Sequence, residues 1–363
     1  MCISPIRIKN PNYGAKKVGL NLLKDCTSAF INVPCRVCPQ CIAARQMELI
    51  QRVLMESQFS HLFFGTFTYN NESLPTWNIN GYNIHYARRD DFQNMLKRVR
   101  NISIYPFRYF AVSEFGSKYG RPHYHLILSV PQMDEPLNIE RYFYNLFLNQ
   151  WRKNYGSDRK PIYRNLCTLS RKFVDGRLST NYDFHFVNPL YSDAGVADVG
   201  FYVLKYLLKA DKHEQNLQRA LRMNLHPTLY NVVWDVVKSK TLFSKGFGLM
   251  EHDLSRCRES FDRERISDVV RNHIRKGIEF GKGKFDYPVF IHPLTGATFP
   301  LSDYYKNYFL TDKDAFAYYF ENVGNSPYLD SIHDSEIKAQ NQIDTIIDQY
   351  RRRCDVVTSK TFL

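Results

Sequence analysis

The stretch that decides the fold is Tyr109–Val130, YFAVSEFGSKYGRPHYHLILSV. Alternation of side-chain character on both sides of its glycine-flanked loop predicts a strand, a loop and a second strand. Side chains two positions apart point to the same face of a strand, so His123 and His125 share a face. If the strands pair as a hairpin, Glu114 comes beside them. We predict that these three side chains bind one metal ion.

The metal that suits this mixed nitrogen and oxygen site is Mg²⁺ or Mn²⁺, with phosphate oxygens and water in the open positions. The third ligand is open at this point. His61 and His185 also flank predicted strands, and either could replace Glu114. The structural alternative is a sheet face on which the histidines pair with carboxylates and hold no metal.

Composition places the chain among globular proteins with a polyanionic partner. Its 363 residues suffice for two or three domains, and 44% hydrophobic and 23% charged residues are ordinary for a packed core. The net charge of +13 favours nucleic acid as the partner, although a merely basic protein has the same balance. Aromatic residues, at 15%, could also stack on bases.

Targeting signals are missing from the sequence. No run of 18 apolar residues predicts a membrane span, and the N-terminal MCISPIRIKN lacks a hydrophobic signal region. We therefore expect a cytoplasmic protein with no membrane partner and with reduced cysteines. The oligomeric state is not predicted.

Cysteines cluster near the N-terminus. VPCRVCPQC places Cys35, Cys38 and Cys41 in a C-x2-C-x2-C pattern, which favours a structural Zn²⁺ site. Zinc needs a fourth ligand, and Cys2 or Cys26 could supply it; we prefer Cys2. The alternatives are an iron–sulfur cluster, although the following Cys-Pro of the ferredoxin pattern is missing, and thiols without a metal.

The remaining patterns predict an α+β fold. His61–Tyr69 is β-branched and aromatic and predicts a central strand, and helices are predicted from Asp90 and over Ile139–Tyr155. We expect a central antiparallel sheet with flanking helices, an N-terminal Cys-rich segment and a mostly helical C-terminal region. The predicted division is a Cys-rich segment and helix in residues 1–60, a catalytic domain in 61–212 and a region without an assigned role in 213–363.

A second candidate element is Asp198–Lys212, DVGFYVLKYLLKADK, which predicts a helix. Tyr202 and Tyr206 are four positions apart and share a helix face, with Lys205 and Lys209 in a second row. Other tyrosine pairs in the chain have the same spacing, so spacing alone is weak evidence. A tyrosine hydroxyl with a pKa of about 10 needs a nearby cation to become a phosphate nucleophile.

Taken together, these motifs resemble a known family. GRPHYHLIL resembles the HUH motif of rolling-circle replication initiators, and YVLKYLLK resembles the paired-tyrosine Y-x-x-K-Y-x-x-K motif of the initiators of small single-stranded DNA phages, the Microviridae. FGTFTY is similar to that family's first motif, and the N-terminal cysteines look like its gokushovirus-type branch. The resemblance covers roughly residues 1–212.

The resemblance implies a role for each matching residue. His123 and His125 would be metal ligands, with Glu114 less secure because the third ligand varies among HUH families. Tyr202 and Tyr206 would be alternating nucleophiles, assisted by Lys205. We also predict that Lys209 and Arg121 contact DNA.

The function implied is a single-strand DNA endonuclease and strand transferase. It would nick the replication origin through a 5′-phosphotyrosine, and so start and end rolling-circle replication of a phage genome in the cytoplasm of a bacterial host. Its partners would be single-stranded and replicative-form origin DNA, with host helicase, single-strand binding protein and polymerase. GIEFGKG at Gly277–Gly283 is no complete Walker A loop, so unwinding would fall to a host helicase.

Other functions remain open on the sequence. A plasmid initiator, a relaxase or a transposase of the HUH superfamily would use the same chemistry. A non-catalytic, zinc-containing nucleic-acid-binding protein would bind DNA regardless of Mn²⁺ or of the tyrosines. An iron–sulfur enzyme would absorb visible light.

Overall fold

The computed structural model describes residues 4–16, 26–36, 38–116, 120–132, 136–157, 159–167, 172–174, 177–179, 184–187, 212–253, 266–281, 288–293 and 296–309. Contacts group the chain into two compact units, Arg52–Val270 and, together, Met1–Gln51 and Arg271–Leu363. The three-part division made from the sequence stays a prediction. Each unit is described by itself.

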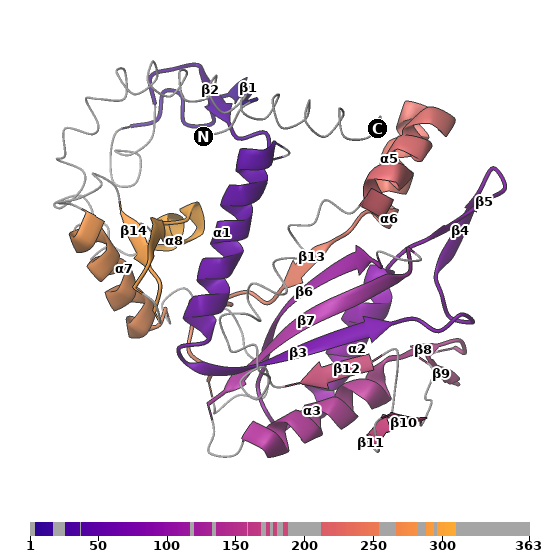
Figure 1. Ribbon diagram of the computed structural model, residues 1–363. Coiled ribbons are helices and arrows are strands. Elements are labelled where there is room, and N and C mark those ends of the chain that lie inside the picture. The colour runs from indigo at the N-terminus through magenta and orange to yellow at the C-terminus, as the bar shows by residue number, and fades with distance from the viewer. Residues whose placement is uncertain are drawn as a thin grey trace, which may run out of the picture. The chain divides into compact units, whose positions relative to one another are not determined.

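The Arg52–Val270 unit contains a five-stranded antiparallel sheet in the order β12-β3-β7-β6-β13 (Figure 1). Its strands are β3 (Ser60–Thr68), β6 (Arg108–Phe115), β7 (Pro122–Pro131), β12 (Phe184–Val187) and β13 (Thr241–Phe243). The predicted α+β class with a central antiparallel sheet is thereby confirmed. The opening stretch of the sequence supplies the β6–β7 hairpin at its centre.

One face of the sheet forms the main core. Tyr124, Leu126 and Leu128 of β7 point to this face and are fully buried against α2 (Arg89–Ile102) and α3 (Pro136–Gln150). The apolar stripe expected on the first helix is confirmed by the burial of Phe92, Met95, Leu96 and Val99. Burial of these large side chains is the dominant stabilising contribution in this unit.

The opposite face of the sheet is apolar in its middle and polar at both ends. Phe64, Phe110 and Ile127 occupy neighbouring register positions in the middle and are buried. Phe247 lies against Phe110, with ring centroids 6.3 Å apart. Because both faces are covered, β7 reads as a nearly continuous apolar run beyond His125.

Smaller elements complete this unit. They are β4 (Thr76–Ile79), β5 (Tyr82–His85), β8 (Arg152–Asn154), β9 (Tyr163–Asn165), β10 (Lys172–Val174), β11 (Arg177–Ser179), α5 (Lys212–Asn224) and α6 (Pro227–Val237). The helix expected over Ile139–Tyr155 ends at Gln150 instead, and β8 follows. The chain turns at Trp151, which is fully buried and donates its indole N–H to the Thr68 carbonyl over 2.9 Å.

The other unit holds the greater part of two helices that cross the unit boundaries, α1 (Pro39–Glu56) and α7 (Asp268–Gly281). It also holds β1 (Ile6–Lys9), β2 (Phe30–Val33), β14 (Val289–Ile291), β15 (Thr298–Pro300) and α8 (Asp303–Phe309). Buried Gln51 joins distant parts of this unit, since its amide donates to Pro300 and accepts from the Ser302 N–H. Within the described residues, no helix has both the length and the apolar character of a membrane span.

Candidate metal centre and its surroundings

Glu114, His123 and His125 converge at one end of the sheet. Glu114 on β6 is the direct register partner of His123 on β7, and His125 lies two positions further on the same face. The Glu114 Oε1 atom lies 2.8 Å from His123 Nε2 and 3.0 Å from His125 Nε2, and the two Nε2 atoms are 3.2 Å apart. The structure therefore brings together the three side chains that the sequence singled out.

Neighbouring groups fix the orientation of both imidazoles. The Nδ1 atom of His123 lies 3.0 Å from the Arg121 carbonyl, and Nδ1 of His125 lies 3.1 Å from the Thr66 hydroxyl. A carbonyl can only accept, so His123 carries a proton on Nδ1 and, when neutral, directs a lone pair from Nε2 toward Glu114. Partners of this kind on the far nitrogen orient metal-binding histidines.

Burial and hydrogen bonding set the charge states. Burial raises the pKa of the Glu114 carboxyl, but hydrogen bonds from His123 and His125 outweigh it and hold the pKa below its ordinary value. Burial lowers the pKa of His125, although the hydrogen bond to Glu114 opposes the change. An ionised carboxylate and a neutral imidazole at pH 7 are the forms that bind metals.

These donors fit a divalent cation. With unprotonated Nε2 atoms, three acceptors would face one another at about the contact distance, so a proton or a metal ion must lie among them. Adjacent ligands of an octahedral ion with bonds of about 2.1 Å lie about 3.0 Å apart, close to the observed 2.8, 3.0 and 3.2 Å. The residues present therefore fit Mg²⁺ or Mn²⁺; which ion binds is not determined by this geometry.

The alternative third ligands are less suitable or not described. His61 pairs with Val130 at the opposite end of β3 from Thr68, the register partner of His123. His185 is the register partner of Thr66, but its side chain lies outside the described part of the structure. Among the described residues, Glu114 is the carboxylate that completes the cluster.

Thr66→Val is expected to weaken Mn²⁺ binding about 10- to 100-fold, because His125 loses the hydroxyl that orients its ring. Thr68→Val is the matched control, since Thr68 points to the same face of β3 and is the partner of His123. Titration of bound Mn²⁺ by electron paramagnetic resonance measures both. Equal affinities in the two variants would contradict a role for the Thr66 hydroxyl, and Thr66→Ser should retain binding.

Arg121 holds the loop before the first histidine. Its Nε atom donates to the Tyr69 carbonyl over 2.9 Å and its Nη1 atom to the Asn71 side chain over 2.9 Å. The side chain thus ties the start of β7 to the segment after β3. The predicted contact of Arg121 with DNA stays a prediction.

Tyr202, Lys205, Tyr206 and Lys209 lie outside the described residues. The chain resumes at Lys212, and His213 lies beside the metal-site hairpin, with its ring 5.2 Å from that of Phe115. A Cβ atom at Gly120, which has a φ of +60°, would collide with the His213 ring. The start of α5 therefore packs on the loop that leads into β7.

The N-terminal cysteines form a second cluster, within the other unit. The ligand atoms of Cys35, Cys38 and Cys41 lie within 4.8 Å of one another, and the Cys35 and Cys41 sulfurs are 4.0 Å apart. Tetrahedral zinc with Zn–S bonds of about 2.3 Å places its sulfurs about 3.8 Å apart. The Cys38 N–H points at the Cys35 sulfur over 3.3 Å, which favours a thiolate there. Cys26 is not part of this cluster, and Cys2 lies outside the described residues.

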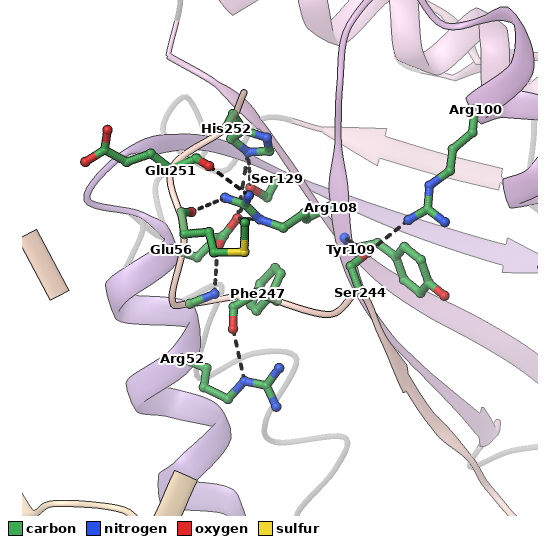
Figure 2. Close-up of polar contacts among 12 residues, drawn as sticks. Arg52, Glu56, Arg100, Arg108, Tyr109, Ser129, Ser244, Phe247, Glu251 and His252 are labelled. Atoms are coloured by element: carbon green, nitrogen blue, oxygen red, sulfur yellow. Dashed lines mark hydrogen bonds and ion pairs between the residues drawn. The ribbon is translucent and has the colours of Figure 1, made fainter. Parts of the chain in front are cut away.

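A buried polar cluster at the other end of the same sheet face was not anticipated from the sequence (Figure 2). Glu56, at the end of α1, is fully buried and pairs with Arg108 Nε at 2.9 Å. Glu56 also accepts from the Ser129 hydroxyl and the Gly248 N–H, and His252 Nε2 lies 2.9 Å from the Ser129 oxygen. The signal for it was a polar pattern at inward positions, since Arg108 and Ser129 share a face with Phe110 and Ile127.

Comparison with known proteins gives one match. Residues 62–211, less than half of the chain, match a family model described as a replication-associated protein of the ORF2 type. The match includes β3, β6 and β7, and it supports a Rep-like, replication-associated protein. No curated protein and no solved structure matches the chain.

Proposed function

We propose that this protein is a metal-dependent endonuclease and strand transferase that nicks single-stranded origin DNA through a tyrosine. The observation that carries the proposal is the convergence of Glu114, His123 and His125 within the segment that matches replication-associated proteins. Mg²⁺ or Mn²⁺ at this site would polarise the scissile phosphate and stabilise its developing charge by several kcal/mol.

The proposed reaction is a phosphoryl transfer. The hydroxyl oxygen of Tyr202 or Tyr206 forms a bond to phosphorus, and the bond from phosphorus to the 3′ oxygen breaks. The tyrosine proton is lost and the leaving oxygen gains one, which gives a 5′-phosphotyrosine and a free 3′-hydroxyl. Lys205 assists by favouring phenolate or by neutralising charge on the phosphate. Attack by a 3′-hydroxyl on the phosphotyrosine reverses the step and rejoins a strand.

Chain connectivity supports the pairing of metal centre and tyrosines. His213 packs on Gly120 and Phe115, next to the strand positions of Glu114 and His123. Tyr206 precedes His213 by only seven positions. Seven residues span at most about 25 Å. The tyrosines are therefore tethered to the same end of the sheet as the metal ligands.

The biological setting that we propose is rolling-circle replication of a gokushovirus-type single-stranded DNA phage, in the cytoplasm of its bacterial host. Host helicase, single-strand binding protein and polymerase would act with the nicked origin. A plasmid initiator, relaxase or transposase would have the same chemistry, and a jelly-roll capsid gene beside the coding sequence would distinguish the phage setting. Paired tyrosines and N-terminal cysteines favour the phage type.

The test of this function is incubation of the full chain with end-labelled, single-stranded fragments tiling the replicon that encodes it. Mn²⁺ should give cleavage at one site and a protein–DNA adduct that resists denaturation, and EDTA should prevent both. DNA binding without cleavage of any fragment in Mn²⁺ or Mg²⁺ would instead favour a non-catalytic nucleic-acid-binding protein.

We further propose that Cys35, Cys38 and Cys41 bind a structural Zn²⁺ ion, with Cys2 as the fourth ligand. Cys38→Ser is expected to lower the zinc content of the purified protein from about one ion per chain to near zero. Buried Cys167 lies in the other unit, and Cys167→Ser is the control. Elemental analysis measures the zinc; an unchanged content in Cys38→Ser, or iron with visible absorbance, would contradict the assignment.

A further inference from the structure

A basic and aromatic hairpin, β8–β9, lies in the same unit as the metal centre. Residues 152–165 carry five cations, Arg152, Lys153, Arg159, Lys160 and Arg164, against one acid, Asp158. None of these cations takes part in the ion pairs formed among the described residues. The segment is thus a concentration of positive charge on the surface.

Like charges face each other on one side of this hairpin. Lys153 and Arg164 are direct register partners. Both lie over the ring of Tyr155, with Lys153 Nζ 5.1 Å and Arg164 Cζ 5.3 Å from the ring centroid. Directly opposed like charges destabilise a strand pair. A pairing that the isolated hairpin disfavours is favoured when an anion binds between the two cations.

The other side repeats the combination of tyrosine and arginine. Arg152 Cζ lies 4.3 Å from the centroid of the Tyr163 ring, and Arg98 Cζ lies 5.8 Å from it. Tyr155 and Tyr163 are 47% and 42% exposed, which is high for tyrosines that already contact side chains. Exposed rings and guanidinium planes are the surfaces on which unpaired bases stack.

The hairpin is held rigidly in place. Arg98 of α2 donates to the Gln150 carbonyl over 2.9 Å and to the Arg152 carbonyl over 2.6 Å. Asn154 accepts from the N–H groups of Gly156 and Ile162 and so closes the loop. The entropy cost of ordering this surface is therefore already met before a ligand binds.

A short chain of contacts connects the hairpin with the metal centre. The Asn165 carbonyl accepts from the side chain of Asn70 over 3.3 Å. The next residue, Asn71, accepts from Arg121, whose carbonyl contacts His123. Hairpin and metal ligands therefore border the same segment after β3. A strand of nucleic acid bound at one can extend to the other.

We propose that the β8–β9 hairpin binds single-stranded DNA beside the metal centre. Bases stack on Tyr155 and Tyr163, and Lys153 and Arg164 contact the phosphate between them. The choice of DNA as the polyanion rests on the proposed function; the stacking surface and the opposed cations do not. The hairpin would present the strand to the metal without taking part in the chemistry.

The test is the affinity of the full-length protein for fluorescein-labelled oligothymidine in EDTA, measured by anisotropy. Tyr155→Ala/Tyr163→Ala should weaken binding on the order of 10- to 100-fold. Tyr155→Phe/Tyr163→Phe should retain it, since the rings still stack. Lys153→Gln/Arg164→Gln should reduce the slope of log affinity against log salt by about 1.4, or about 0.7 for each lost phosphate contact.

Matched controls lie on a second hairpin and on a helix. The β4–β5 hairpin also exposes a tyrosine, Tyr82 at 68%, but has no Lys or Arg over residues 76–85, so Tyr82→Ala should bind as the wild type does. Exposed Arg141 on α3 is the control for loss of charge. Circular dichroism verifies that each variant is folded. Hairpin variants that bind oligothymidine like these controls would overturn the proposal, as would a loss confined to single-stranded RNA.

The two proposals fail separately. If the wild type cleaves DNA while the hairpin variants bind it unchanged, the hairpin is wrong and the endonuclease stands. If no fragment is ever cleaved but the tyrosine variants lose oligothymidine binding, the hairpin stands and the endonuclease is wrong. Binding in EDTA excludes any contribution of cleavage to the measured affinity.

Discussion

Glu56→Ala is expected to lower the free energy of unfolding of the Arg52–Val270 unit by about 3–5 kcal/mol, because it leaves Arg108 charged and buried without its partner. The Glu56 and Arg108 side chains are 0% and 2% exposed. The change also removes the acceptor for Ser129 and for the Gly248 N–H (Figure 2). Each donor left unsatisfied adds to the loss.

Tryptophan fluorescence during urea unfolding measures this effect in the correct unit. The chain has three tryptophans, Trp77, Trp151 and Trp234, and all lie between Arg52 and Val270. Asp235→Ala is the matched control, since it breaks the exposed Asp235–Lys238 ion pair on α6 and should change little. A Glu56 variant as stable as this control would contradict the structural role of the cluster.

A double variant separates the pair from the buried charge. Removing both partners, as in Glu56→Leu/Arg108→Met, should cost less than Glu56→Ala alone, because no unpaired charge is left in the interior. A double variant that is less stable than the single one would show that the hydrogen bonds of Arg108 to the Met250 and Glu251 carbonyls dominate instead.

His123→Ala is expected to lower the rate of DNA cleavage by about a thousandfold or more while leaving most of the DNA affinity intact. The variant loses one of three ligands that lie about 3 Å from one another. The metal contributes several kcal/mol to the transition state, and each 1.36 kcal/mol corresponds to a factor of ten in rate. Binding depends mainly on phosphate contacts and salt, so it should persist.

Single-turnover cleavage in Mn²⁺, with anisotropy for binding, separates the two effects of His123→Ala. His85→Ala removes an imidazole from the β4–β5 hairpin and should cleave at the wild-type rate. A fall in affinity equal to the fall in rate would mean that His123 serves binding rather than chemistry. Full cleavage by His123→Ala would remove the metal centre from the mechanism.

The sheet and the metal ligands were predictable because strand alternation carries both. Period-two spacing placed His123 and His125 on one face without any knowledge of the fold. Hairpin pairing then fixed Glu114 as the register partner of His123. A preference between Glu114, His61 and His185 needed the register of β3 and β12, which depends on contacts far apart in the sequence.

The surroundings of the site were not predictable in the same way. Glu56, Arg108 and His252 come from three separate segments, and single-sequence patterns cannot show that they meet. The β8–β9 hairpin was hidden because Arg152–Tyr155 continues the helical pattern of Ile139–Gln150. Tertiary contacts decide that boundary, above all the burial of Trp151 and the bracing of its neighbours by Arg98.

The central claim is that a metal held by Glu114, His123 and His125 activates DNA for attack by Tyr202 or Tyr206. Denaturing gel electrophoresis of labelled origin DNA incubated with Mn²⁺ tests it most directly, because only a covalent adduct migrates with the protein. The wild type and each single Tyr→Phe variant should give an adduct, and Tyr202→Phe/Tyr206→Phe should give none. An adduct formed by the double variant would contradict the claim.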